Sequence, residues 1–76
     1  MREQIISTLA TVFSVKPETL SDQSSVDTVD NWDSLRHMDM IIALEQTFGI
    51  EFADDEVAEL LSVKLIETIL GEKLKR

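Results

Sequence analysis

Three stretches of the chain carry apolar side chains at the spacing of one face of an α-helix. The chain has 76 residues, and apolar residues recur every three or four positions in residues 5–13, 35–48 and 63–74. The residues of these stripes are Ile5, Ile6, Leu9, Val12, Phe13, Leu35, Met38, Ile41, Ile42, Leu44, Phe48, Val63, Ile66, Ile69, Leu70 and Leu74. We find no strand-like alternation and no internal repeat. The pattern predicts an all-α bundle.

The small size and the lack of cysteine limit the chemistry of the chain. A domain of this length buries only about 60% of its unfolded surface, so a deep catalytic pocket is not expected. Without cysteine, thiol chemistry requires a thiol from outside the chain. The longest apolar run, Met40–Leu44, is far shorter than the roughly 20 residues that span a bilayer, and no signal sequence is recognisable. We expect a cytoplasmic protein with a single domain over residues 1–76.

Negative charge is concentrated in the middle of the chain. Fifteen acidic and seven basic residues give a net charge of −8, which repels nucleic acid and favours basic partners. Between Pro17 and Glu59 there are twelve acidic residues and a single basic one, Arg36. This distribution predicts an acidic docking face and no nucleic-acid binding.

A polar segment from Pro17 to Asp33 separates the first two predicted helices. Because Pro17 lacks an amide hydrogen and disfavours helical geometry in the residue before it, the first helix is predicted to end near residues 14–16. The segment that follows is rich in Ser, Asp, Thr and Asn and reads as one long loop, a kind of connection that is usually functional. We expect its apolar residues to hold it against the bundle, namely Leu20, Val26, Val29 and Trp32.

Capping residues mark the boundaries of the later helices. The second helix is predicted to start at Asp33 or Ser34 and to end at Gly49, which supplies a left-handed residue. A short third helix is predicted between three acidic residues at 54–56 and Leu61. A cap at Ser62, with Lys73, Lys75 and Arg76 near the other end, frames the fourth helix. The expected core consists chiefly of Val12, Leu44, Phe48, Leu61, Ile66 and Ile69.

No residue pattern predicts catalysis or a metal site. The single histidine, His37, has no serine or cysteine partner that helical spacing places beside it, so we interpret it as an exposed helix residue. Asp54 and Asp55 are adjacent and do not face each other, so we interpret them as charges at a helix start. We expect neither catalytic residues nor a metal ion.

Ser34 is the residue best placed for chemical modification. It lies at the predicted start of the second helix, between Asp33 and Leu35. A serine before a helix is commonly an N-cap. A phosphodiester on its hydroxyl would also lie at the positive end of the helix dipole, near unpaired amides that favour an anion. Capping and modification both remain open from the residues alone.

Several segments together resemble one known family. They are Val15-Lys16-Pro17-Glu18, residues 20–29, Asp33-Ser34-Leu35, Ala43-Leu44-Glu45 and Phe48-Gly49-Ile50. Over nearly its whole length the chain is similar to the acyl carrier proteins, a family of four-helix bundles with a long first loop and a short third helix. The resemblance implies that a phosphopantetheinyl transferase moves 4'-phosphopantetheine from coenzyme A to Ser34, and that the arm's thiol holds cargo as a thioester.

The resemblance also implies a surface for partner enzymes. Family members present acidic residues of the second helix, with apolar residues after the serine, to basic patches on acyl-loading and acyl-processing enzymes. Taken alone, such residues are an ordinary solvated surface. The expected partner-binding residues are Asp33, Leu35, Arg36, Met38, Asp39, Glu45, Asp54, Asp55 and Glu56.

Three positions depart from the family pattern. Arg36-His37 stands where acidic or neutral residues are usual, which predicts a weaker negative face beside the attachment point. Asn31 replaces a glycine, a tolerable change because asparagine reaches left-handed backbone angles more readily than most residues. Trp32 replaces a small residue, and we expect it to pack against the bundle, although an indole there could also shape partner contact.

The function expected from the sequence is therefore that of a monomeric, non-catalytic carrier that does not span a membrane. Its cargo is either a fatty or polyketide acyl chain or an aminoacyl group, as in peptidyl and D-alanyl carriers. The core residues are candidates for enclosing an acyl chain. The alternative from another class is an unmodified helical interaction module in which Ser34 caps the second helix.

Overall fold

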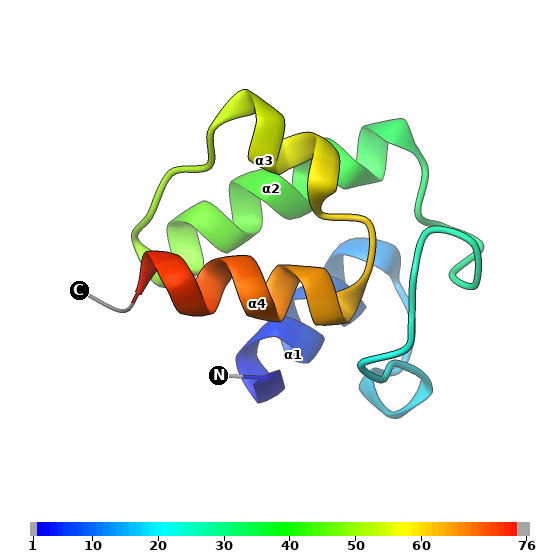
Figure 1. Ribbon diagram of the computed structural model, residues 1–76. Coiled ribbons are helices and arrows are strands. Elements are labelled where there is room, and N and C mark those ends of the chain that lie inside the picture. Colours follow the sequence, from blue (N-terminus) through cyan, green and yellow to red (C-terminus); the bar gives the residue numbers. More distant parts are fainter. Residues whose placement is uncertain (1, 75–76) are drawn as a thin grey trace.

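The computed structural model describes residues 2–74, which form four α-helices and one 3-10 turn (Figure 1). Within this range there is no extended strand, only an isolated bridge between Ser25 and Ser62, and no helix is long and apolar enough to cross a membrane. The all-α bundle with a long first loop and a short third helix is confirmed. The elements are α1 (Arg2–Phe13), η1 (Pro17–Thr19), α2 (Ser34–Phe48), α3 (Asp54–Glu59) and α4 (Val63–Lys73).

The core lies between α1, α2 and α4. Its fully buried residues include Ile5, Leu9, Phe13, Met40, Leu44, Leu60, Val63, Ile66 and Leu70. Of the residues predicted for the core, Leu44 and Ile66 are fully buried, and Val12, Phe48 and Ile69 pack against it while partly exposed. The prediction for Leu61 was wrong, because this side chain is 43% exposed. The third helix ends at Glu59, two residues before Leu61, and Leu60 takes the buried position.

The ends of α1 and α2 both use a left-handed residue. Ser14 follows α1 with a φ of 58°, and the amide of Val15 donates to the Ala10 carbonyl at 3.0 Å. Gly49 follows α2 with a φ of 66°, as predicted, and its amide donates to the Glu45 carbonyl at 2.8 Å. Both helices therefore end where their last carbonyls find partners beyond the helix.

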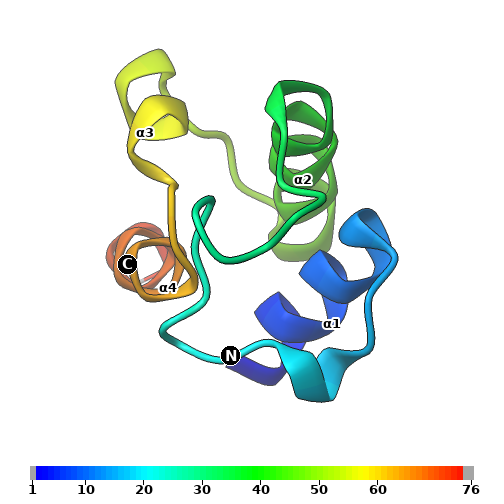
Figure 2. The ribbon, with the colours of Figure 1, turned by 90° about the vertical axis from the view of Figure 1, so that its right-hand side faces the viewer.

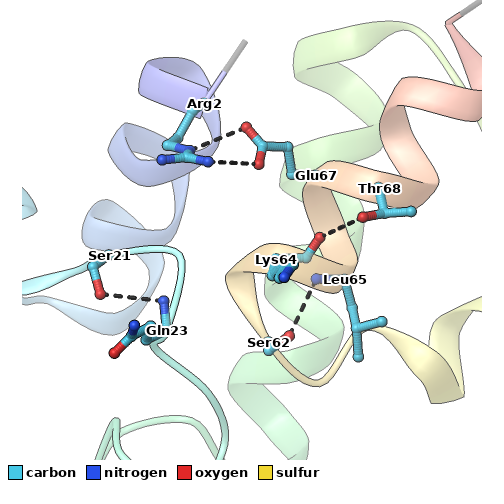
Figure 3. Close-up of polar contacts among 8 residues, drawn as sticks. All are labelled: Arg2, Ser21, Gln23, Ser62, Lys64, Leu65, Glu67 and Thr68. Atoms are coloured by element: carbon cyan, nitrogen blue, oxygen red, sulfur yellow. Dashed lines mark hydrogen bonds and ion pairs between the residues drawn. The ribbon is translucent and has the colours of Figure 1, made fainter.

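The long loop is held by its own serine and threonine side chains and by the bundle. Ser24 Oγ accepts from the Ser21 amide at 2.9 Å, and Ser21 Oγ accepts from the Gln23 amide at 3.2 Å (Figure 3). The amide of Val63 donates to the Ser24 carbonyl at 2.9 Å, which joins the loop to the start of α4. The predicted anchors are confirmed, since Leu20 and Trp32 are buried and Val26 and Val29 pack against the core.

Polar contacts fix the position of α4. Ser62 caps it, as predicted, by accepting from the Leu65 amide at 3.1 Å (Figure 3). The Arg2 guanidinium binds both carboxylate oxygens of Glu67 at 3.0 and 3.1 Å, which joins α4 to α1 (Figure 3). The hydrogen bond to Arg2 lowers the pKa of Glu67. Of the basic residues predicted near the end of α4, Lys73 lies in the helix, and Lys75 and Arg76 lie outside the described residues.

The short helix α3 lies at the edge of the bundle (Figures 1 and 2). None of its residues is buried. Its Glu56 carboxylate pairs with Lys73 Nζ at 2.8 Å and accepts from the Ala53 amide at 2.7 Å. The hydrogen bond to Lys73, followed by that from Ala53, lowers the pKa of Glu56. These polar contacts, together with the packing of the partly buried Val57 against the core, place this helix.

Candidate functional site

The start of α2 is capped by Asp33 and not by Ser34. Asp33 has extended backbone geometry, and its Oδ1 accepts from the Arg36 amide at 2.8 Å. Its carbonyl accepts from the His37 amide at 2.8 Å. Ser34 is the first residue of the helix itself. Of the two residues predicted for the start of this helix, Asp33 is therefore the cap and Ser34 is not.

The Ser34 hydroxyl is therefore unused by the fold. The residue is exposed, and its hydroxyl makes no hydrogen bond within residues 2–74. As the first two residues of the helix, Ser34 and Leu35 have amides without an intrahelical partner. These amides and the helix dipole favour an anion at this end of α2. A phosphodiester on Ser34 fits this environment.

A groove of about 590 Å³ begins beside Ser34. It lies between the first turns of α2, the length of α3 and the long loop, which meet on one side of the bundle (Figures 1 and 2). An arm attached to the hydroxyl would start at its edge. The apolar lining residues are Val26, Trp32, Met38, Val57, Ala58 and Leu61, and the polar ones are Asp33, Ser34, His37 and Asp54.

His37 joins three parts of the chain at this groove. Its Nδ1 accepts from the indole Nε1–H of Trp32 at 3.0 Å, and its Nε2 lies 2.9 Å from the Val57 carbonyl oxygen. The side chain is half-buried. The interpretation of His37 as an exposed helix residue was therefore wrong, because the ring bridges the loop and α3.

Trp32 and Asn31 hold the end of the loop on α1. Trp32 is only 6% exposed, and its ring centroid lies 4.9 Å from that of Phe13. The prediction that Trp32 packs against the bundle is confirmed. Asn31 Nδ2 donates to the Phe13 carbonyl at 2.7 Å. Asn31 does not adopt the left-handed geometry expected of it, so its contribution is this side-chain bond.

The residues expected to bind partners fall into two groups. Leu35, Met38, Asp39, Asp54 and Asp55 are exposed. The other acidic residues of the set contact groups within the chain, and Arg36 is the partner of one of them. These internal contacts are Asp33 with Arg36 at 3.6 Å, Glu45 with the Phe52 amide at 3.0 Å, and Glu56 with Lys73 at 2.8 Å.

The exposed surface of α2 also contains an apolar residue that the sequence did not single out. Ile42 is 51% exposed, and it follows Leu35, which is 76% exposed, by seven positions. Met38 lies between them and is also exposed. Spacings of three and four positions place these residues on one stripe of the helix. The same spacing was visible in the sequence, where it was read as part of the core face.

Comparison with known proteins identifies relatives over nearly the whole chain. The family described as "Phosphopantetheine attachment site" matches residues 3–71. An acyl carrier protein of Thermosynechococcus vestitus is 32% identical over 72 residues, which are 95% of this chain and 89% of that protein. An acyl carrier protein of Coprothermobacter proteolyticus is 30% identical over 77 residues, covering 96% and 94% of the two chains. One of Campylobacter hominis is 31% identical over 68 residues, covering 90% and 86%.

Proposed function

The chain belongs to the acyl carrier protein family, whose cofactor is phosphopantetheine, and we propose that Ser34 is the residue that carries it. The single observation that supports this best is that Asp33, and not Ser34, caps the helix. Asp33 accepts the capping hydrogen bond, while the exposed Ser34 hydroxyl serves no structural purpose. Attachment at Ser34 would leave every hydrogen bond of the helix start intact.

When bound, phosphopantetheine supplies a thiol that holds an acyl group as a thioester. The chain's own residues position the attachment point. Asp33 fixes the first turn of α2, and the amides of Ser34 and Leu35 stabilise negative charge beside the hydroxyl. The apolar wall formed by Met38, Val57 and Leu61 offers a surface beside the arm. This wall supports an acyl chain as cargo in preference to an aminoacyl group.

We further propose that the protein is a carrier without catalytic activity of its own. Its substrates and products would be exchanged with separate enzymes that bear basic docking patches. The exposed residues of α2 and α3 support such docking, because Leu35 and Met38 offer apolar contact and Asp39, Asp54 and Asp55 offer negative charge. Contacts of this kind act on encounter rate and salt dependence more than on affinity. A monomeric state and a cytoplasmic location stay predictions.

Intact-mass measurement tests the attachment site. The chain is incubated with coenzyme A, magnesium and a broad-specificity phosphopantetheinyl transferase, and wild type is compared with Ser34→Ala and with Ser7→Ala, which changes another exposed serine. We expect wild type and Ser7→Ala each to gain one phosphopantetheine and Ser34→Ala to gain none. A folded Ser34→Ala variant that is still modified would refute the assignment.

An unmodified wild type would be a different failure. If the folded chain stays unmodified with this enzyme and with the transferase of its own organism, the carrier function itself is wrong. The helical interaction module would then replace it. Circular dichroism of each variant establishes that the chain is folded before its mass is compared.

A further inference from the structure

We propose that Trp32, His37 and the Val57 carbonyl form a proton-sensitive clasp, which holds α3 against α2 while His37 is neutral and releases it when His37 is protonated. The three groups come from the end of the long loop, the first turn of α2 and the middle of α3. They meet at the groove beside Ser34. The clasp is a property of the unmodified chain and does not depend on the proposed function of Ser34.

The hydrogen-bond partners fix the protonation state of the ring. An indole Nε1–H can only donate, so His37 Nδ1 must offer it a lone pair across their 3.0 Å contact. A backbone carbonyl can only accept, so Nε2 must carry the proton across its 2.9 Å contact with Val57. Both contacts are satisfied together by one species only, the neutral imidazole with its hydrogen on Nε2.

Protonation of His37 at Nδ1 would place two hydrogen-bond donors, this N–H and the indole N–H of Trp32, against each other. A second hydrogen on Nδ1 would point at the Trp32 N–H, which is largely shielded from water because the residue is only 6% exposed. The indole is fixed by its packing on the Phe13 ring at 4.9 Å, whereas the His37 side chain is half-buried. The imidazole is therefore the group that turns away. That rotation takes Nε2 from the Val57 carbonyl and removes a bond between α2 and α3.

Few other polar contacts would replace the lost bond. None of the residues of α3 is buried, and its remaining polar contacts lie at Glu56, which binds Lys73 and the Ala53 amide. Besides the packing of the partly buried Val57 against the core, the helix is thus held at one point by Glu56 and at another by His37. Loss of the second allows α3, which forms a wall of the groove, to move relative to Ser34.

The charges around the clasp come from α2 and α3. Asp33 at the start of α2 and Asp54 at the start of α3 line the groove, and Arg36 beside His37 pairs with Asp33 at 3.6 Å. The loop contributes Val26 and Trp32 to the groove, which are uncharged. Ser34 and His37 are three positions apart and share a helix face. A phosphodiester on Ser34 would add a negative charge near the ring.

Nuclear magnetic resonance of the unmodified wild-type chain tests the clasp. Between about pH 8 and pH 5, the range in which histidine changes charge, we expect the indole N–H signal of Trp32 and the amides of residues 57–61 to shift with one midpoint, that of His37. We expect the protection of the indole hydrogen, relative to a free indole at the same pH, to be about tenfold lower with the ring protonated, the effect of losing one hydrogen bond. At the higher pH the ring should be the Nε2–H tautomer.

Two substitutions separate the clasp from a simple effect of charge. Trp32→Phe retains an aromatic ring on Phe13 but removes the opposing donor. Its His37 should still titrate while the amides of residues 57–61 no longer follow it. His37→Gln keeps a donor for the Val57 carbonyl and cannot be protonated in this range, so its amides should also be insensitive to pH.

Three results would overturn the clasp. The first is a neutral ring with its hydrogen on Nδ1 in the wild type, which needs no variant to detect. The second is an indole signal that stays constant through the titration of His37. The third is a Trp32→Phe variant whose α3 amides shift with pH as much as those of the wild type.

Discussion

The helices of the bundle and the short helix α3 are held in place by different forces. Fully buried side chains such as Leu9 of α1, Leu44 of α2 and Ile66 of α4 fix the bundle. Helix α3 has no fully buried residue; its partly buried Val57 packs against the core, and the Glu56 ion pair and the contact of His37 with the Val57 carbonyl also hold it. Apolar burial contributes stability at any pH, whereas these polar contacts depend on protonation. The position of α3 can therefore respond to pH, whereas the core between α1, α2 and α4 does not.

The difference matters because the groove lies between these two parts. The first turn of α2, which carries Ser34, belongs to the bundle that the core fixes. Helix α3 forms the opposite wall of the groove. Regions with few buried apolar contacts open locally at lower free energy than the core. Ser34, the proposed attachment point, can thus stay fixed while the surface next to it moves.

The largest expected effect comes from emptying the core. Leu44→Ala removes a fully buried side chain and should lower the free energy of unfolding by about 2–5 kcal/mol. Val57→Ala in α3 removes a partly buried one and should lower it by about 1 kcal/mol or less. Urea unfolding followed by circular dichroism measures both. Equal losses of stability would show that α3 contributes to the core as much as α2 does.

A smaller effect is expected at the start of α2, where two neighbouring residues should behave differently. Asp33→Ala removes the cap that accepts from the Arg36 amide and should cost about 1 kcal/mol of stability. Ser34→Ala removes an exposed side chain without a structural bond and should change stability by less than about 0.5 kcal/mol. The same unfolding measurement compares the pair. A larger loss for Ser34→Ala would return the cap to Ser34.

The smallest effect is expected from the ion pair of α3 in acid. Lys73 and the Ala53 amide lower the pKa of Glu56 below its ordinary value of 4.5. The contacts therefore stabilise α3 fully above that pH and lose their contribution as the pH falls below it. In wild type, we expect the protection of α3 amides against hydrogen exchange to decrease over this range. Glu56→Gln should show low protection throughout.

A matched control keeps this last prediction specific. Glu59 is another carboxylate of α3 and is exposed, so Glu59→Gln should follow the wild-type curve. If Glu59→Gln and Glu56→Gln behaved alike, the acid response would come from the total charge of the helix and not from the pair with Lys73.

The bundle could be predicted from the sequence because apolar spacing and capping residues act locally. Pro17, Gly49 and Ser62 marked helix limits within a few residues, and the stripes that contain Leu44 and Ile66 marked the core. Leu61 was misplaced because the end of a six-residue helix decides whether position 60 or 61 turns inward. A difference of one or two residues there is not encoded in the apolar pattern.

The site was predicted less completely because its contacts are distant in sequence. Ser34 was singled out from the Asp-Ser-Leu segment, but the choice between Asp33 and Ser34 as the cap needed the backbone geometry. The place of His37 depends on Val57, twenty residues away, which no local rule brings together. Trp32 was the one sequence signal for the position of His37, because a buried indole N–H requires an acceptor nearby.

The separation of the cap from the neighbouring hydroxyl has a consequence for how this chain can change over time. A serine at position 34 offers the fold nothing that alanine would lack, so stability alone would let the position drift. Under the proposed function, only chemistry performed on the hydroxyl would favour serine at this position, and loss of that chemistry would leave a folded remnant. Conversely, a designer could replace Ser34 with a residue of different reactivity and keep the helix start unchanged, because Asp33 maintains it.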